Sequence, residues 1–259
     1  MSWFETLRIS LQRLFVIVAA AAVLSGCAAT PPGQVNDPLE PLNRQIFAFN
    51  DAVDTVLIRP GAVVYRDLMP RPIKMVLGNL IDHLTLPLTI VHDLLQGKPD
   101  RAQVAFGRFF INTIIGVGGL FDVATPHGLK LHREDAGQTL AVHGVESGPY
   151  LVLPLLGPSN LRDGVGTLID WFIDPVGIAA YVPDNGQTLR ITRAGATIIV
   201  RREALLEPLD ALRQSLDYYA ATRAAYAQRR QLQINDGQVN TPSFNNDPFA
   251  AAEEANKAN

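Results

Sequence analysis

The sequence predicts a mainly α-helical protein, and three observations support this fold class. Apolar residues recur every three or four positions in several long segments, which is the period of one helical face. Strand-like patterns are confined to residues 150–153 and 196–200. The longest apolar run after residue 27 extends over about eight residues, from Ile114 to Phe121, whereas a transmembrane helix needs about 20. We therefore expect a helical domain without a conventional membrane-spanning helix.

Residues 1–26 have the pattern of a secretory signal peptide. Arg8 and Arg13 precede an apolar stretch at residues 14–24, and the small residues Ser25-Gly26 follow it. This apolar stretch is short for a bilayer span, and small residues at a cleavage point do not suit a stop-transfer helix. A short membrane anchor is therefore the less favoured alternative.

The segment Leu24-Ser25-Gly26-Cys27 resembles the lipobox of bacterial lipoproteins, in which a diacylglycerol is attached to the cysteine sulfur before cleavage. Cys27 is the only cysteine, so no intramolecular disulfide can form in an oxidising compartment. The expected anchor carries three acyl chains, palmitate among them; one myristoyl chain would hold only marginally. Residue 28 is Ala rather than the Asp typical of inner-membrane retention, which favours the outer membrane.

The composition of the mature chain argues against a nucleic-acid partner. Two of the 22 basic and one of the 25 acidic side chains lie in residues 1–26, so the remainder has a formal charge of −4. A mildly acidic chain without basic runs lacks the electrostatic footprint of a nucleic-acid-binding protein. Its length suits one large domain or two small ones.

Residues 27–36 are expected to form the acylated N-terminus and a flexible tether, because Pro and Gly interrupt them and no apolar period is present. The helical domain is predicted to begin at Asp37-Pro38, with the carboxylate available as a cap. The first helix is predicted over residues 39–58 and to end at Arg59-Pro60-Gly61. Its apolar face is formed by Leu42, Ile46, Phe49, Val53 and Val56. Phe47 lies off this face, which suggests a second buried or lipid-facing surface.

Two further helices are predicted in the first half of the domain. Residues 73–95 keep a helical period, with Pro87 as a kink or junction. Residues 101–115 are apolar around most of the circumference, which indicates a helix that is buried or in contact with lipid. Residues 116–119 include three glycines, so we expect a bend or a close approach there.

The second half contains more irregular sequence. Residues 147–158 are apolar but rich in Pro and Gly, and such backbone is tolerated at membrane depth only where protein covers it or a cavity adjoins it. A helix is predicted over residues 161–182, interrupted at Pro175-Val176-Gly177, with Trp171 as either a membrane-interface anchor or a core residue. A last helix is predicted over residues 207–232, with Leu216 on its apolar face. Residues 233–259 are expected to be a disordered tail.

No common catalytic arrangement is recognisable in the sequence. Ser147 lies in Gly-Val-Glu-Ser-Gly rather than a Gly-x-Ser-x-Gly elbow. The histidines lack the spacing of a zinc protease, and surface or capping roles are expected for them. Asp163, Asp170 and Asp174 lie on or near one helix but have no matching nucleophile or metal site. We therefore expect neither an enzyme nor a metal protein, although an exported lipase remains the obvious competitor.

Several segments together resemble the MlaA (VacJ) lipoprotein family. The match extends over residues 36–232, and the helical domain is predicted at residues 37–232. The segments are Asn36-Asp37-Pro38-Leu39-Glu40-Pro41-Leu42-Asn43-Arg44, Arg59-Pro60, Tyr65-Arg66-Asp67, Leu95-Gln96-Gly97, Arg108-Phe109-Phe110-Ile111-Asn112-Thr113-Ile114-Ile115-Gly116-Val117-Gly118-Gly119 and Gly148-Pro149-Tyr150. The Arg-Phe-Phe-Ile-Asn-Thr block followed by glycines is the most specific of them. The tail is not covered.

The resemblance implies a single ring-like helical domain embedded in one leaflet of the outer membrane, facing the periplasm, with a central amphipathic channel. Phospholipids misplaced in the outer leaflet would pass through it to a soluble periplasmic carrier, MlaC. Trimeric porins are the implied membrane partners, and no cofactor or catalysis is implied beyond the covalent lipid on Cys27. A structural lipoprotein that scaffolds porins or envelope machinery is the alternative.

Within this scheme, some residues are candidates for the channel or for lipid contact. A channel for lipid needs small and polar residues with a few charges along its wall. The polar candidates are Asn50, Asp51, Asn112 and Asp163. Phe47 and Phe49 are candidates for acyl-chain contact or gating, with core packing as the alternative, and Gly148-Pro149 is a candidate hinge or a rigid bend.

Overall fold

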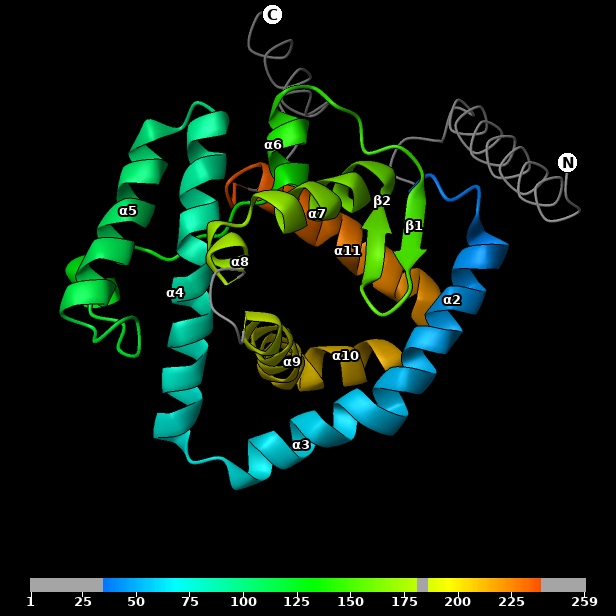
Figure 1. Cartoon of the computed structure of the whole chain (residues 1–259). Helices are drawn as coiled ribbons and strands as arrows, with labels where there is room; N and C mark the ends of the chain where they lie inside the picture. Colours follow the sequence, from blue (N-terminus) through cyan, green and yellow to red (C-terminus); the bar gives the residue numbers. More distant parts are fainter. Residues whose placement is uncertain (1–34, 181–185, 239–259) are drawn as a thin grey trace, which may run out of the picture.

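The computed structural model describes residues 35–180 and 186–238, and these residues form a mainly helical domain (Figure 1). The elements in chain order are α2 (Glu40–Val53), the π-helical turn η1 (Asp54–Ile58), α3 (Arg59–Leu68), α4 (Arg71–Leu95), α5 (Pro99–Ile114), the 3-10 turn η2 (Thr125–His127), α6 (Ala136–Val142), β1 (Tyr150–Leu153), β2 (Gly157–Asn160), α7 (Leu161–Ile173), α8 (Pro175–Ala179), α9 (Gly186–Ala204), α10 (Leu206–Arg213) and α11 (Tyr218–Ile234). The predicted fold class is confirmed. The predicted signal peptide, Cys27 and most of the predicted tail lie outside the described residues.

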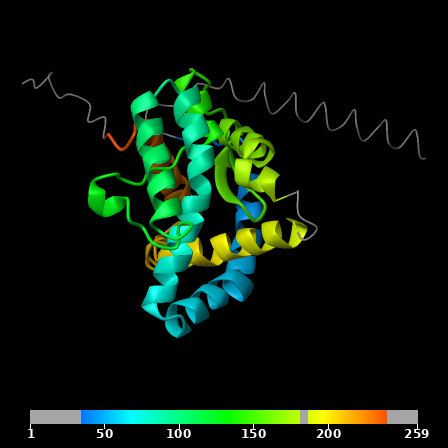
Figure 2. The same ribbon diagram turned by 60° about the vertical axis from the view of Figure 1, so that its left-hand side comes forward.

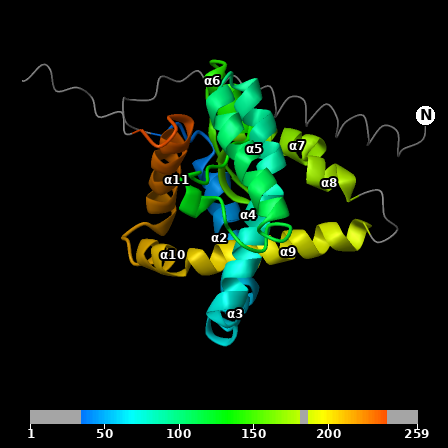
Figure 3. The ribbon, with the colours of Figure 1, turned by 90° about the vertical axis from the view of Figure 1, so that its left-hand side faces the viewer.

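The helices are arranged as a frame with other helices inside it. In Figure 1, α2 and α3 form one side of the frame and α4 forms the next, with α5 outside α4. The elements α6, α7 and α11 lie on the remaining side, while α9 and α10 lie inside. Figures 2 and 3 show α9 running across the direction of α4. Within the described ranges, no helix is both long and apolar enough to cross a membrane.

The first helix does not end at Arg59-Pro60-Gly61 as predicted; α2, η1 and α3 form one continuous rod to Leu68. The Arg59 amide donates to the Asp54 carbonyl through the π-helical turn. Pro60 follows in the first turn of α3, where its missing N–H is tolerated. Gly61 serves close approach, since a Cβ there would lie 3.1 Å from Ile199 Cδ1 of α9. Pro60 therefore marks the junction between η1 and α3, and Gly61 marks the contact between α3 and α9.

The predicted capping role of Asp37 is also wrong. Helix α2 begins after Leu39 without a side-chain cap. The Asp37 carboxylate instead accepts hydrogen bonds from Asn43 Nδ2 at 2.8 Å, from the Tyr219 hydroxyl and from Arg223 Nη1 at 2.6 Å. Asp37 thus attaches the start of the domain to α11.

The apolar face predicted for the first helix lies mainly on the outside of the molecule. Leu42 and Phe49 are about half exposed, and Val56 is 79% exposed. The inward face presents Asn43, which is 2% exposed, and Phe47, whose ring stands edge-on to that of Tyr219 at 5.5 Å. Polarity along this rod is therefore reversed relative to a helix of a soluble protein.

Helices α4 and α5, predicted as two separate helices, pack side by side (Figure 1). Pro87, predicted to be a kink or junction, lies inside α4 without ending it, so it is not a junction between two helices. Phe106, Phe110 and Ile114 of α5 are all more than half exposed, so the apolar circumference of this helix faces outward rather than into a core. The predicted bend after α5 is confirmed: Gly119 has φ +88°, and a Cβ there would overlap the His83 ring.

The strand prediction is correct for residues 150–153 and wrong for residues 196–200. β1 pairs with β2 in an antiparallel hairpin in which Tyr150 lies opposite Asn160 and Leu153 opposite Gly157. The second strand, residues 157–160, thus includes Gly157 and Pro158, which were expected to be irregular. Residues 196–200 lie within α9, where the Thr197 hydroxyl donates to the Arg193 carbonyl at 2.7 Å. Contact with α3 overrides the local preference of β-branched residues for strands.

The helices of the second half are shorter than predicted. The break in the segment 161–182 comes at Asp174, which caps α8 through the Val176 amide, and residues 181–185 lie outside the description. The segment 207–232 forms two helices, because Asp217 caps α11 by accepting from the Ala220 amide at 3.0 Å. Leu216, predicted on the apolar face, is fully exposed at this break.

The buried interior contains more polar than apolar side chains in the part of the chain that the structure describes. Tyr150, Val152 and Tyr219 form a small apolar cluster, with Phe47 packed against it. Asn43 connects this cluster to α2, since its Nδ2 donates to the Tyr150 carbonyl at 3.0 Å and its Oδ1 accepts from the Val152 amide at 2.9 Å. A polar interior beneath exposed apolar faces is the opposite of an ordinary globular protein.

Candidate functional site

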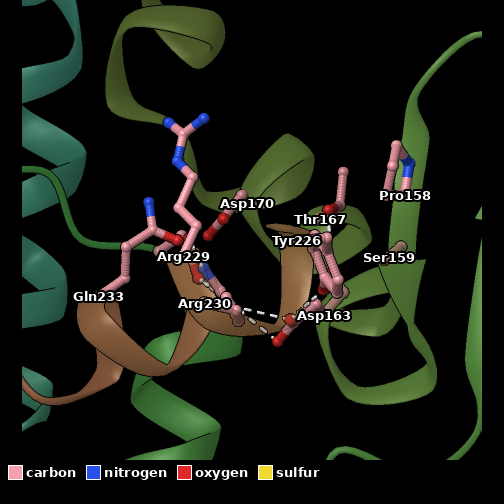
Figure 4. Close-up of a pocket in the computed structure, with 10 residues that line it drawn as sticks. Pro158, Ser159, Asp163, Thr167, Asp170, Tyr226, Arg229, Arg230 and Gln233 are labelled. Atoms are coloured by element: carbon pink, nitrogen blue, oxygen red, sulfur yellow. Dashed lines mark hydrogen bonds and ion pairs between the residues drawn. The ribbon is translucent and has the colours of Figure 1, made fainter. Parts of the chain in front are cut away.

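An ionic network joins α7, α11 and the start of α6 in the interior. Arg230 Nη2 donates to Asp163 Oδ1 at 3.0 Å and to Asp135 Oδ1 at 2.6 Å. Asp163 also accepts from the Tyr226 hydroxyl at 2.5 Å and from Asn160 Nδ2 at 2.8 Å. Figure 4 shows Arg230 and Asp163 directed toward one another at the cavity wall. The network fixes three elements that are distant in the sequence.

The environment of the network keeps its charges in place. Burial alone would raise the pKa of Asp163, but hydrogen bonds from Arg230 and Tyr226 lower the pKa below the ordinary value. Burial and the hydrogen bond to Asp163 together raise the pKa of Tyr226. Asp163 is therefore an anion and Tyr226 a neutral donor across the physiological pH range.

Two cavities are lined in part by α7. One, of about 270 Å³, is lined by polar and charged residues of β2, α7 and α11, including Asp163, Asp170 and Arg229. The other, of about 320 Å³, lies between the hairpin and α7 and is lined mainly by apolar residues such as Leu153 and Trp171. Pairing of a polar with an apolar cavity is suited to an amphiphilic molecule.

Helix α9 places arginines inside the frame of helices. Arg202 pairs with Asp54 of η1 at 2.7 Å, and Arg193 pairs with Asp174 at 2.6 Å. Arg201 is exposed to solvent, yet burial and the neighbouring cations Arg133 and Arg229 lower its pKa. Arg201 is thus an exposed side chain of α9 in the electrostatic field of other cations.

The surface or capping role expected for the histidines is confirmed for His127 and His143, which are exposed, with His143 as the C-cap residue of α6. His92 and His132 instead make structural contacts inside the domain. His92 is 1% exposed and bonds Thr139 Oγ1 at 2.9 Å and Asp170 Oδ1 at 2.8 Å. His132 bonds the buried Asp93 at 2.8 Å. Among the described residues, no group of three or more His, Cys, Asp or Glu side chains has an arrangement that would hold a metal ion.

Comparison with known proteins places this geometry in a family. The family model described as MlaA lipoprotein matches residues 35–233. The chain belongs to the MlaA lipoprotein family. The resemblance inferred from the sequence segments is thereby confirmed over nearly the same residues.

Individual MlaA relatives cover most of the chain. Proteins of Escherichia coli (strain K12) and Shigella flexneri, each named "Intermembrane phospholipid transport system lipoprotein MlaA", are 35% identical over 240 residues, which are 88% of this chain and 90% of theirs. The protein of that name from Haemophilus influenzae is 30% identical over 239 residues, 88% of this chain and 92% of its own. A solved structure described under "Structural basis for maintenance of bacterial outer membrane lipid asymmetry" is similar with a TM-score of 0.66 and 37% identity, covering 77% of this chain and 99% of that chain.

The most specific MlaA segment, residues 108–119, organises the loop that follows α5. Arg108 and Asn112 are buried, and Asn112 Oδ1 accepts from the Val123 and Ala124 amides at 2.9 and 3.0 Å. Arg108 Nη2 donates to both oxygens of Asp122 at 3.1 Å. Asn112, predicted as a channel candidate, thus holds this loop, and its contact with lipid stays a prediction.

The other polar candidates make separate contacts, although Asn50 and Asp51 are neighbours on α2. Asn50 fastens the hairpin to α2, donating to the Leu153 carbonyl at 2.9 Å and accepting from the Leu155 amide at 2.7 Å. Asp51 pairs with Arg213 of α10 at 2.5 Å. Of the four polar candidates, Asp163 is the one that lines the polar cavity. The roles of all four in lipid passage remain predictions.

The aromatic and hinge candidates are distinguished by their surroundings. Phe47 packs among the rings of Tyr218 and Tyr219, while Phe49 is about half exposed on the outer face of α2. Gly148 has φ +65°, a conformation that favours glycine, and the Pro149 carbonyl accepts from the Leu161 amide at 3.1 Å. The Gly148-Pro149 segment is therefore a well-bonded bend whose motion is untested.

Sequence reasoning did not identify the cations that complete the site. Arg230, Arg229, Arg201 and Arg193 were assigned no role, although each lies near the cavities or inside the frame. Their partners are distant in sequence: Arg230 and Asp163 are 67 residues apart. No local period or motif reveals such a pairing, so this information comes from the fold.

The Asp122 carboxylate gives a pH-dependent test of the loop after α5. Burial would raise the pKa of Asp122, but hydrogen bonds from Thr125, Asn112 and Arg108 lower it to about 2. Since the folded pKa lies below the ordinary value, its contribution is present above pH 4 and is lost as the pH falls through about 2. We expect Asp122→Asn to lower the free energy of unfolding by about 2 kcal/mol at pH 7 and by much less below pH 3.

Urea unfolding in detergent micelles, followed by far-UV circular dichroism at several pH values, measures this difference. Asp100→Asn is the matched control, because Asp100 is exposed and has no side-chain hydrogen bond in the described ranges. An Asp122→Asn deficit that stays constant from pH 7 to pH 2.5 would contradict the assignment.

Proposed function

We propose that this chain removes mislocalised phospholipid from the outer leaflet of the outer membrane and passes it to a periplasmic carrier. It acts without catalysis and is held at the inner leaflet by the lipid on Cys27. Relatives of this chain across 88% of its length carry phospholipid transport in their names, which supports the substrate class.

The observation that carries the proposal is the reversed polarity of the domain. Large apolar side chains on α2, α3, α4 and α5 are exposed, whereas Arg, Asp, Asn and His side chains are buried. Extended exposed apolar surface indicates contact with lipid or with a protein partner. Without a membrane-spanning helix among the described elements, an arrangement lying within one leaflet suits these faces.

The interior supports passage of an amphiphile. The frame of helices in Figure 1 surrounds α9 and α10, and α9 presents Arg193 and Arg201 within it. A lipid headgroup needs polar and charged partners along its route, and the polar cavity beside α7 provides further polar and charged side chains. We infer a ring-like domain with a central amphipathic channel from these features.

Deletion of the gene, with complementation by the full chain, tests the proposal. Loss of the protein should allow phospholipid to accumulate in the outer leaflet and should raise detergent sensitivity, and the full chain should reverse both. Leaflet composition that is identical with and without the protein would overturn the proposal.

A structural lipoprotein that scaffolds trimeric porins is the second candidate, and the exposed face of α5 favours it. Phe106 and Phe110 offer a surface that fits a porin wall as well as lipid. The two functions differ in the effect of interior substitutions. Arg201→Glu should reduce phospholipid clearance if the interior conducts lipid, whereas a scaffold predicts that it is silent while Phe110→Ser is not.

A further inference from the structure

The polar and apolar cavities lie on neighbouring faces of the same helix, α7. The polar cavity is lined by Asp163, Thr167 and Asp170 of this helix, spaced four and three residues apart. The apolar cavity is lined by Leu168 and Trp171, together with Thr167. Thr167 is shared by both cavities, so a molecule that crosses this residue would contact both walls.

One charged side chain that lines the polar cavity has no hydrogen-bond or ion-pair partner among the described residues. Asp163 pairs with Arg230, and Asp170 bonds His92 and the Ala136 amide. Arg229, exposed on α11, makes no hydrogen bond or ion pair within residues 35–180 and 186–238. Figure 4 shows its side chain extending away from the Arg230–Asp163 pair. Asp135, the third carboxylate of the cavity, also pairs with Arg230. All three carboxylates therefore have partners already, and Arg229 is available to an anion.

A second cation strengthens the preference for an anion. Burial and repulsion from Arg133 and Arg229 lower the pKa of Arg201 of α9, although the carboxylate of Asp82 opposes the shift. A bound anion would relieve the repulsion between such cations. Guanidinium groups suit phosphate oxygens in particular, because they donate two parallel hydrogen bonds.

The apolar cavity offers the complementary surface. Leu156, Leu168 and Trp171 line it and remain at least half exposed. Its opposite wall is Leu151 and Leu153 of the hairpin. Covering such side chains with an apolar chain is favourable, because it removes apolar surface from water. Arg229 lines the polar cavity on the neighbouring face of α7.

We propose that the two cavities form one binding site for a single phospholipid, with the phosphate at Arg229 and one acyl chain between β1 and α7. The identity of the ligand class rests on the proposed function. A site with both a cation and an apolar groove distinguishes a phospholipid from two simpler ligands. Free phosphate would leave the groove empty, and a fatty acid would lack the phosphodiester.

Photocrosslinking with the purified acylated full-length protein in detergent tests this site. The probe is phosphatidylglycerol with a diazirine on one acyl chain. We expect crosslinks at Leu168 and Trp171 that unlabelled phosphatidylglycerol displaces, whereas equal concentrations of inorganic phosphate or oleate do not. Displacement by phosphate or oleate as effective as that by phosphatidylglycerol would overturn the assignment of ligand.

Substitutions separate the two halves of the site. Arg229→Gln should weaken binding about tenfold or more, the effect of losing a charge-assisted hydrogen bond, and Arg229→Lys should restore part of it. Leu168→Gln should remove the crosslink in the groove. The control is Arg66→Gln on α3, because Arg66 is exposed and its side chain pairs, within the described ranges, only with its neighbour Asp67. Circular dichroism verifies that each variant is folded.

Transfer of phospholipid from vesicles to the periplasmic carrier, measured on the same preparations, distinguishes this inference from the proposed function. Normal transfer with crosslinks elsewhere and silent Arg229 and Leu168 variants would overturn the site alone. Crosslinking in the groove without any transfer by the unmodified protein would support the site and overturn the function. The expected result is that Arg229→Gln loses both the crosslink in the groove and the transfer to the carrier, while Arg66→Gln keeps both.

Discussion

Asp163→Ala is expected to destabilise the domain by about 3–5 kcal/mol, the cost of breaking a buried ion pair by removing one partner. The carboxylate accepts from Arg230, Tyr226 and Asn160. Its removal leaves the Arg230 guanidinium, whose side chain is 10% exposed, with the partly exposed Asp135 as its remaining carboxylate partner. Urea unfolding at pH 7 in detergent micelles, followed by far-UV circular dichroism, measures the loss.

Two further variants show whether the buried charge is the cause. Asp67→Ala removes an exposed carboxylate paired with Arg66 and should change stability by less than about 0.5 kcal/mol. Adding Arg230→Met to Asp163→Ala should recover part of the loss, because Arg162 is then the one cationic partner of Asp163 left without its carboxylate in the described interior. Equal losses in Asp67→Ala and Asp163→Ala, or strictly additive losses in the double variant, would contradict this account.

The sequence was sufficient to predict most helices and insufficient to predict their boundaries. Long segments with a helical period became α4, α5 and α7, because that period survives whichever face is buried. The boundaries failed where tertiary contacts intervene. Pro60 continues a helix because a π-helical turn precedes it, and residues 196–200 are helical because α9 packs against α3.

Which face of a helix points inward could not be predicted from its period. The stripe that includes Leu42 and Phe49 was identified, yet Phe47 and Asn43 face the interior instead. A period specifies that one face differs from the other, and the environment decides which face is covered. In this domain the exposed face is apolar, in agreement with the membrane location that we propose.

The candidate site was predicted only in part for a related reason. Asp163 was selected as a charged residue on an apolar helix, and it does line the polar cavity. Its partner Arg230 and the free Arg229 come from α11, which the sequence presented as an ordinary amphipathic helix. Asn112 was selected for its polarity, but its hydrogen bonds serve the loop after α5.

Cys27→Ser is expected to abolish the function in cells, although Cys27 lies outside the described residues. A serine hydroxyl does not replace the thiol that receives the diacylglycerol, so the variant would lack the acyl chains that hold the protein at the outer membrane. Interfacial apolar surface alone binds reversibly, whereas several acyl chains make the attachment effectively permanent. Fractionation of the envelope should therefore show the variant lost from the outer membrane, with phospholipid accumulating in the outer leaflet as in the deletion strain.

The neighbouring position provides the matched variants. Ala28→Ser should leave location and phospholipid clearance unchanged, while Ala28→Asp should move the acylated protein to the inner membrane and impair clearance. Together these variants separate acylation from sorting. Full clearance by Cys27→Ser would show instead that the exposed apolar faces of α2 to α5 suffice to place the domain, and that the anchor at Cys27 is dispensable.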